Sequence, residues 1–149
     1  MRFLFDQSEC DAMIARINKL SPESKALWGK MSVSQMLLHS QKPLRIAFGE
    51  ENIKRNLFGI LFGRIAKKTL VNDSPFGKNL PTAPSFVVKN QPDFATEKEK
   101  LIALIRRFQE GGPSVLSKKP HGFFGPMSEM DWSKSNWKHL DHHLRQFGV

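Results

Sequence analysis

The residues with the clearest potential for chemistry are three histidines near the C-terminus, His139, His142 and His143. The segment around them is predicted to be helical, and residues four apart in a helix lie one turn above each other on the same face. His139 and His143 can therefore direct two imidazoles toward one metal ion. A spacing of three residues is also compatible with one face, so the pair His139 and His142 stays an alternative.

A metal site of this kind needs a third ligand from elsewhere, because catalytic zinc typically has three protein ligands and one open position. His39 is the best candidate, since it lies at the margin of the apolar face of another predicted helix. Gln35, one turn before it, and Gln146, three residues after His143, are candidates to orient an imidazole from behind. Asp141 should point away from the two histidine ligands, which favours a solvent or salt-bridge role.

Amphipathic helices must position these residues, and capping residues mark where four of them begin. Ser8 with Asp11, Ser32 with Gln35, and Ser128 with Asp131 form capping-box patterns, and Asp93 can cap a further helix. The first helix should run from about Ser8 to Leu20, and the last to about Phe147. The helix after Asp93 carries a core stripe that we expect to comprise Phe94, Leu101, Leu104, Ile105 and Phe108.

The segment between the second and third capped helices lacks such a clear helical signal along its whole length. Residues 51–71 form a glycine-containing helical stretch whose cations should face outward and whose apolar residues should face inward, namely Ile53, Leu57, Ile60, Leu61, Ile65 and Leu70. Residues 72–91 are rich in Pro, Asn and Gly and should form a long loop, with one strand-like fragment at residues 85–88. Loops of this length in compact domains are usually functional or mobile.

Composition limits the class of protein. A chain of 149 residues fits one domain, 1–149, and its single cysteine, Cys10, excludes an intrachain disulfide. The most apolar stretch, 56–70, is interrupted by glycines and cations and falls short of the about 18 apolar residues a membrane span requires. We therefore expect a soluble, cytoplasmic protein with no membrane partner. The stripes favour an all-α helical bundle with long connecting loops.

The net charge of +9 favours acidic partners through its long-range field. The cations are scattered in pairs rather than in runs, however, which is more typical of solvated faces than of a nucleic-acid interface. Nucleic acid is thus not the expected partner. Binding of a polyanion without catalysis remains an alternative.

Four sequence segments carry a resemblance to a known family: FGKNLPTAPSF, DFATEKEKLIALIRRF, HGFFGPMSEMDW and KHLDHHLRQFGV. The chain from about Trp28 to Val149, which contains these segments, resembles a branch of the DinB-like (YfiT-type) superfamily of metalloenzymes. The resemblance implies a four-helix bundle with a divalent metal held by three histidines, one on the second helix and two from an HxxxH motif on the fourth. Matched by position, these are His39, His139 and His143.

The resemblance also leaves other residues as candidates for the surroundings of the site. His142 lies outside the matched ligand set, and His121 precedes Gly122, where the branch usually has a proline. His121, His142, Gln35 and Gln146 are thus candidates to line or support the site. The glycine after His121 indicates a looser loop and argues against that role for His121, and exposed polar side chains are the alternative for Gln35 and Gln146.

Three neutral ligands leave the full charge on a divalent ion, which favours deprotonation of a bound water or thiol. Zinc or nickel is the expected cofactor, with iron or manganese as alternatives. Characterised relatives in the superfamily include transferases and isomerases that use a low-molecular-weight thiol, so the resemblance implies a thiol-dependent transferase acting on a small-molecule substrate. The sequence leaves two alternatives open: a metal-dependent hydrolase, and a purely structural bundle that mediates association. A homodimer is compatible with a bundle of this size.

Overall fold

The described part of the chain is all-helical. The computed structural model describes residues 2–54, 57–81 and 83–149. Within these ranges lie two short 3-10 helices, η1 (Pro84–Phe86) and η2 (Gly112–Val115), and five α-helices: α1 (Gln7–Asn18), α2 (Val33–Ala47), α3 (Leu57–Val71), α4 (Phe94–Gly111) and α5 (Glu129–Gln146). No strand is present in them, and an isolated bridge joins His121 to Gly125. The all-α prediction is confirmed.

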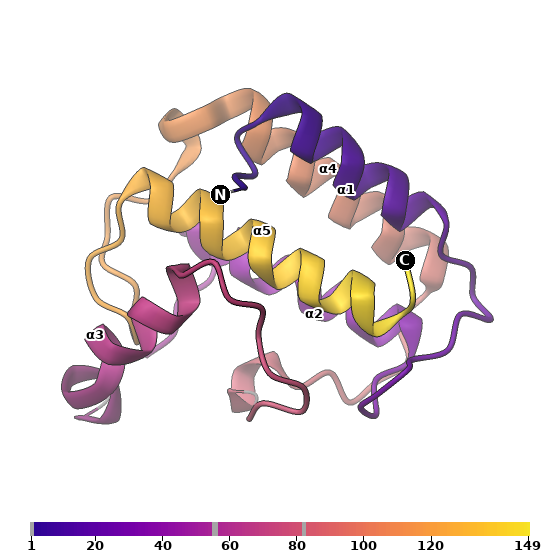
Figure 1. Ribbon diagram of the computed structural model, residues 1–149, viewed down its shortest axis with the longest axis horizontal. Helices are drawn as coiled ribbons and strands as arrows, with labels where there is room; N and C mark the ends of the chain where they lie inside the picture. The colour runs from indigo at the N-terminus through magenta and orange to yellow at the C-terminus, as the bar shows by residue number, and fades with distance from the viewer. Residues whose placement is uncertain (1, 55–56, 82) are drawn as a thin grey trace.

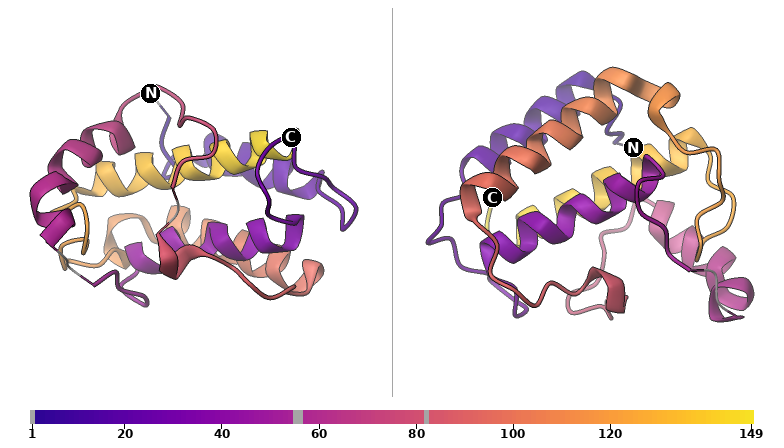
Figure 2. Two further views of the ribbon diagram at one scale, coloured as in Figure 1. Left: turned by 90° about the horizontal axis from the view of Figure 1, so that it is seen from below. Right: turned by 180° about the vertical axis from the view of Figure 1, so that it is seen from behind.

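Four of the helices pack around a common core. Each contacts two others: α2 contacts α4 and α5, and α1 also contacts α4 and α5. Figures 1 and 2 show these four helices running alongside one another, with α3 at one end of the assembly. The largest fully buried side chains come from all four helices and include Met13, Ile17, Met36, Leu37, Leu44, Leu101, Ile105, Phe108, Leu140 and Leu144. Burial of these stripes is what fixes the relative positions of α2 and α5.

Three of the four predicted helix starts are confirmed. Ser32 with Gln35 and Ser128 with Asp131 form complete capping boxes, and Asp93 accepts a hydrogen bond from the Thr96 amide. The predicted cap of α1 is wrong by two residues, because the Asp6 carboxylate, rather than the Ser8 hydroxyl, is the capping group and accepts from the Ser8 and Glu9 amides. A carboxylate before the helix satisfies two free amides and interacts favourably with the helix dipole.

The strand-like fragment at 85–88 is a wrong prediction. Residues 84–86 form the 3-10 helix η1, which begins with Pro84. Proline fixes its own backbone angle and has no amide to donate to a sheet, so it favours a helical turn at this point. The rest of the segment 72–91 lies in loops and turns. Position 82 is outside the described residues.

The orientation predicted for α3 is also wrong. Positions 55 and 56 of the predicted stretch lie outside the described residues, and α3 begins at Leu57. Leu57, Ile60, Leu61 and Ile65, which were expected inside, are 77%, 55%, 64% and 66% exposed. The glycines face the body of the protein instead: a Cβ on Gly63 would lie 2.0 Å from the Phe123 carbonyl oxygen. Such close backbone approach is open only to glycine, and it turns the apolar stripe outward.

No helix in the described ranges combines the length and the apolar character that crossing a bilayer requires.

Candidate metal centre

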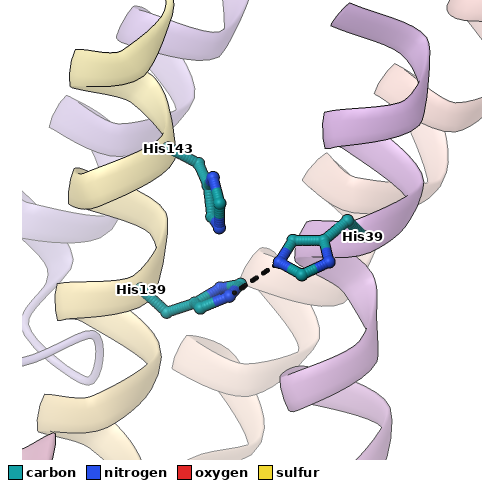
Figure 3. A group of neighbouring side chains, drawn as sticks. All are labelled: His39, His139 and His143. Atoms are coloured by element: carbon teal, nitrogen blue, oxygen red, sulfur yellow. Dashed lines mark hydrogen bonds between the residues drawn. The ribbon is translucent and has the colours of Figure 1, made fainter. Parts of the chain in front are cut away.

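Helices α2 and α5 bring together three histidines that are far apart in the sequence. His39 extends from α2, while His139 and His143 extend from successive turns of α5, and Figure 3 shows the three imidazoles converging. One ring nitrogen of each lies within 4.8 Å of the others. The Nε2 atoms of His39 and His139 are 3.2 Å apart. Two zinc–nitrogen bonds of about 2.0–2.1 Å at a tetrahedral angle place their nitrogens roughly 3.3 Å apart, so the donor spacing fits one ion.

A backbone carbonyl orients the His39 imidazole. The Nδ1 atom of His39 lies 3.0 Å from the carbonyl oxygen of Phe86, the last residue of η1. A carbonyl oxygen can only accept, so Nδ1 carries the hydrogen and donates it. The lone pair of His39 is therefore on Nε2, the nitrogen that faces the other two histidines.

The His143 imidazole is oriented by a relay through Gln146. The Gln146 side-chain nitrogen donates to the Trp28 carbonyl at 2.7 Å, which leaves its oxygen to face His143. That oxygen lies 2.8 Å from His143 Nδ1, so Nδ1 again carries the hydrogen and Nε2 carries the lone pair. A hydrogen-bond partner behind a metal-binding histidine fixes its tautomer and ring orientation in just this manner.

The relay requires a glycine beside it. Gly29 has a φ of +82°, and a Cβ there would lie 2.6 Å from the Gln146 side-chain nitrogen. Both the left-handed backbone and the lack of space therefore select glycine at this position. The loop after α1 is thus shaped so that Gln146 can reach Trp28.

His139 is the least constrained member of the cluster. Its Nε2 faces His39 Nε2, but its Nδ1 is buried and has no hydrogen-bond partner among the described residues. Buried polar atoms in folded proteins are nearly always paired, and an unpaired one costs about 1–3 kcal/mol. The unpaired Nδ1 of His139 is therefore an exception that calls for an explanation, and a functional role of the cluster is one.

Burial keeps the cluster neutral. Desolvation is the main cause that lowers the pKa of His143 to about 3, followed by the nearby His39. Desolvation also lowers the pKa of His39, and the pKa of His139 lies well below its usual range because burial is reinforced by the other histidines. All three are therefore uncharged at neutral pH. Neutral imidazole is the form that binds metal ions.

The histidine between the two on α5, His142, lies apart from the convergence point. Its ring packs edge-on against Trp28 and Phe76, with ring centroids 5.9 Å and 5.8 Å away. Its ring contact with the cluster is to the His143 ring, at 5.0 Å between centroids. Of the two α5 pairs that spacing allowed, the structure brings the pair four residues apart toward His39.

Gln35 and His121 belong to other contacts. Gln35 completes the capping box of α2, and its amide group donates to the Val88 and Asn90 carbonyls. The Nδ1 atom of His121 accepts from the Phe123 and Phe124 amides, within the turn that the bridge to Gly125 closes. Neither has a hydrogen bond to the three histidines, so Gln146 is the one candidate supporting residue that binds a cluster imidazole directly.

The turn around His121 also accounts for Gly122. A Cβ at Gly122 would lie 1.7 Å from the Ile53 carbonyl oxygen, so any side chain there would displace one of the two segments.

Asp141 has the role expected for it, because it forms salt bridges of 2.9 Å with Arg16 and 2.7 Å with Arg145.

Sequence reasoning missed the two carbonyls that orient the imidazoles, those of Phe86 and Trp28. A backbone carbonyl is present at every position and carries no signal in the residue type. The only available signal was indirect: the length and composition of the loop that contains Phe86 indicated a functional segment.

The fold and the cluster define an all-helical protein with a buried three-histidine site between two helices. Comparison with protein families places the chain within one of them. A family described as "Protein of unknown function (DUF1569)" matches residues 4–148, and the chain belongs to this family. No match is found among the curated proteins or the solved structures.

Proposed function

We propose that this chain is a divalent-metal-dependent enzyme whose ligands are His39, His139 and His143. The observation that carries the proposal is the convergence of three neutral imidazoles, two of which are oriented from behind so that Nε2 faces the others. The resemblance to DinB-like proteins supports the same three residues. In this proposal α1, α2, α4 and α5 are the four helices of the corresponding bundle.

Zinc or nickel is the proposed cofactor, because both accept imidazole nitrogen. When bound, the ion would supply Lewis-acid chemistry toward a water molecule or a thiol. The chain itself supplies a ligand set without a carboxylate, since the cluster contains only histidines. Such a set adds no negative charge and therefore suits an anionic partner such as a thiolate. On this basis, and on the resemblance, we propose a thiol-dependent transferase.

The metal proposal is tested by titration of the purified, chelator-treated protein with zinc and with nickel. Calorimetry and elemental analysis should both give about one ion per chain. His39→Ala and His139→Ala should each lower the affinity by at least about a hundredfold, because each removes one of three protein ligands. His142→Ala is the matched control, since it removes a histidine of the same helix that lies outside the convergence point. Equal binding by all four proteins, or no binding by any, would refute the assignment.

The thiol proposal needs a separate test. Cobalt-substituted protein should develop a thiolate-to-cobalt charge-transfer band when 2-mercaptoethanol is added, because a thiolate would then occupy an open coordination position. Cobalt bound without such a band would exclude the thiol-dependent reaction while leaving the metal site intact.

A further inference from the structure

Helix α3 exposes its apolar side chains to solvent, and the packing of the rest of the helix requires this. Its inner side carries Gly59 and Gly63, which lie against the backbone of Phe123. On the same side, the Lys67 ammonium group forms an ion pair of 2.7 Å with Asp131 and donates to the Pro126 carbonyl. Rotation of α3 to bury its leucines would break these contacts. The outward orientation is therefore built into the sequence.

The exposed side of α3 forms a continuous surface that we call the outer face, comprising Leu57, Ile60, Leu61, Arg64, Ile65 and Lys68. Each of its members is exposed. They are related by spacings of three, four or seven residues, which places them along one side of the helix. Figures 1 and 2 show α3 at the end of the molecule, beside α5 and away from α1 and α4. The outer face is thus accessible to a large, flat partner.

The charge on the outer face has one sign. Arg64 and Lys68 lie one turn apart among the apolar residues, and α3 contains no Asp or Glu. The whole chain is also strongly positive, at +9. Leucine and isoleucine interspersed with cations are typical of helices that lie in the interface of a membrane, where apolar side chains enter the acyl region and cations contact anionic headgroups.

We propose that the outer face of α3 docks on the surface of a bilayer that contains anionic lipids, with the helix axis parallel to the membrane. Peripheral binding of this kind requires no spanning segment, so the lack of a helix able to span the bilayer does not oppose it. The proposal therefore replaces the expectation, drawn from the sequence, that the protein has no membrane partner.

Charge argues against a second copy of the chain as the occupant. A twofold interface would bring the same face of both copies together. It would then bury Arg64 and Lys68 from each copy with no acidic residue of α3 to pair with them. Unpaired charges are costly to remove from water, whereas anionic headgroups would neutralise them.

The test is flotation of the full chain with vesicles of phosphatidylcholine alone, and with vesicles of equal parts phosphatidylcholine and phosphatidylglycerol. The protein should float only with the anionic vesicles, and less so as salt concentration rises. The double variant Leu57→Ser/Leu61→Ser should lower the partition coefficient by about tenfold or more, because it removes two apolar side chains from the interface. Arg64→Gln/Lys68→Gln should weaken binding and flatten its salt dependence.

Two control variants remove equivalent groups elsewhere. Leu27→Ser/Val87→Ser removes two apolar side chains that are 71% and 50% exposed, and Lys118→Gln/Lys119→Gln removes two exposed cations. Both should bind anionic vesicles like the parent protein. Absence of binding by the parent, or equal losses in the control and α3 variants, would overturn the proposal. So would light scattering that shows a lipid-independent dimer which Leu57→Ser/Leu61→Ser converts to a monomer.

Discussion

Removal of the Gln146 side-chain oxygen should weaken metal binding without touching a ligand. Gln146 is 4% exposed, so water cannot readily replace its hydrogen bond to His143 Nδ1 in a Gln146→Leu variant. The buried N–H of His143 would then be unpaired, which costs about 1–3 kcal/mol. This cost raises the free energy of the His143 tautomer that presents the Nε2 lone pair to the cluster, which is the tautomer a metal ion would bind. It corresponds to a loss in metal affinity of about tenfold to a hundredfold, the range seen when the partner of a ligating histidine is removed.

A second substitution separates the two hydrogen bonds of Gln146. Gln146→Glu retains an acceptor for His143 but loses the amide group that donates to the Trp28 carbonyl. Its metal affinity should therefore lie above that of Gln146→Leu, because the His143 tautomer keeps its partner. Gln109→Leu, which changes a partly buried glutamine bound to the Phe5 carbonyl, is the control.

The assay is competition for zinc against a chromophoric chelator of known affinity, performed on folded variants that are checked by circular dichroism. Zinc affinity should be highest in the parent and in Gln109→Leu, lower in Gln146→Glu, and lowest in Gln146→Leu. Parental affinity in Gln146→Leu would show that the hydrogen bond at 2.8 Å does not control the His143 tautomer, and the explanation of the site's orientation would fail.

Two further predictions concern stability and α3. Burial lowers the pKa of His121 to about 4, below its ordinary 6.5, so the stability it contributes is complete above about pH 6.5 and is lost as the pH falls toward 4. His121→Asn keeps an acceptor for the Phe123 and Phe124 amides but cannot be protonated. It should reduce this pH-dependent loss of unfolding free energy by about 3 kcal/mol, measured by urea unfolding above pH 6.5 and near pH 4. An unchanged pH dependence would contradict the prediction. Gly63→Ala places a Cβ 2.0 Å from the Phe123 carbonyl oxygen and should therefore raise amide hydrogen exchange in α3 while α2 and α5 stay protected. Unaltered exchange in α3 would mean that the close contact with Phe123 is not needed to hold this helix in place.

The parts of the fold that the sequence predicted correctly depend on local rules. The capping boxes at Ser32 and Ser128 each involve residues three positions apart, so their pattern is complete within one turn of chain. The start of α1 was misplaced because Ser8 satisfies the same pattern, and the competing carboxylate of Asp6 lies just before it. Choosing between two overlapping caps requires knowing which backbone angles the chain adopts.

The orientation of α3 could not be predicted by the same reasoning. Periodicity identifies an apolar stripe but does not say that the stripe is buried. Here the opposite side contains Gly59 and Gly63, and the backbone of Phe123 approaches them closely. That contact joins segments about sixty residues apart, which no local pattern in either segment encodes.

For the candidate site, local geometry accounts for two of the proposed ligands and chain topology for the third. The four-residue spacing of His139 and His143 follows from the helical repeat. His39 lies a hundred residues earlier and reaches them because the core packs α2 against α5. His142 satisfied a spacing rule as well, and only its packing against Trp28 and Phe76 distinguishes it.

The two carbonyls that orient the cluster belong to loops rather than to the four packed helices. Phe86 lies in the segment between α3 and α4, and Trp28 lies between α1 and α2. The Phe86 carbonyl fixes the proton of His39 on Nδ1 directly, and the Trp28 carbonyl does so for His143 through Gln146, so that Nε2 of both faces the cluster. Displacement of either loop would release one imidazole from its tautomer while leaving the helices in place. If the cluster binds metal as proposed, its affinity is thereby linked to the conformation of the loops, even though all three proposed ligands are supplied by helices.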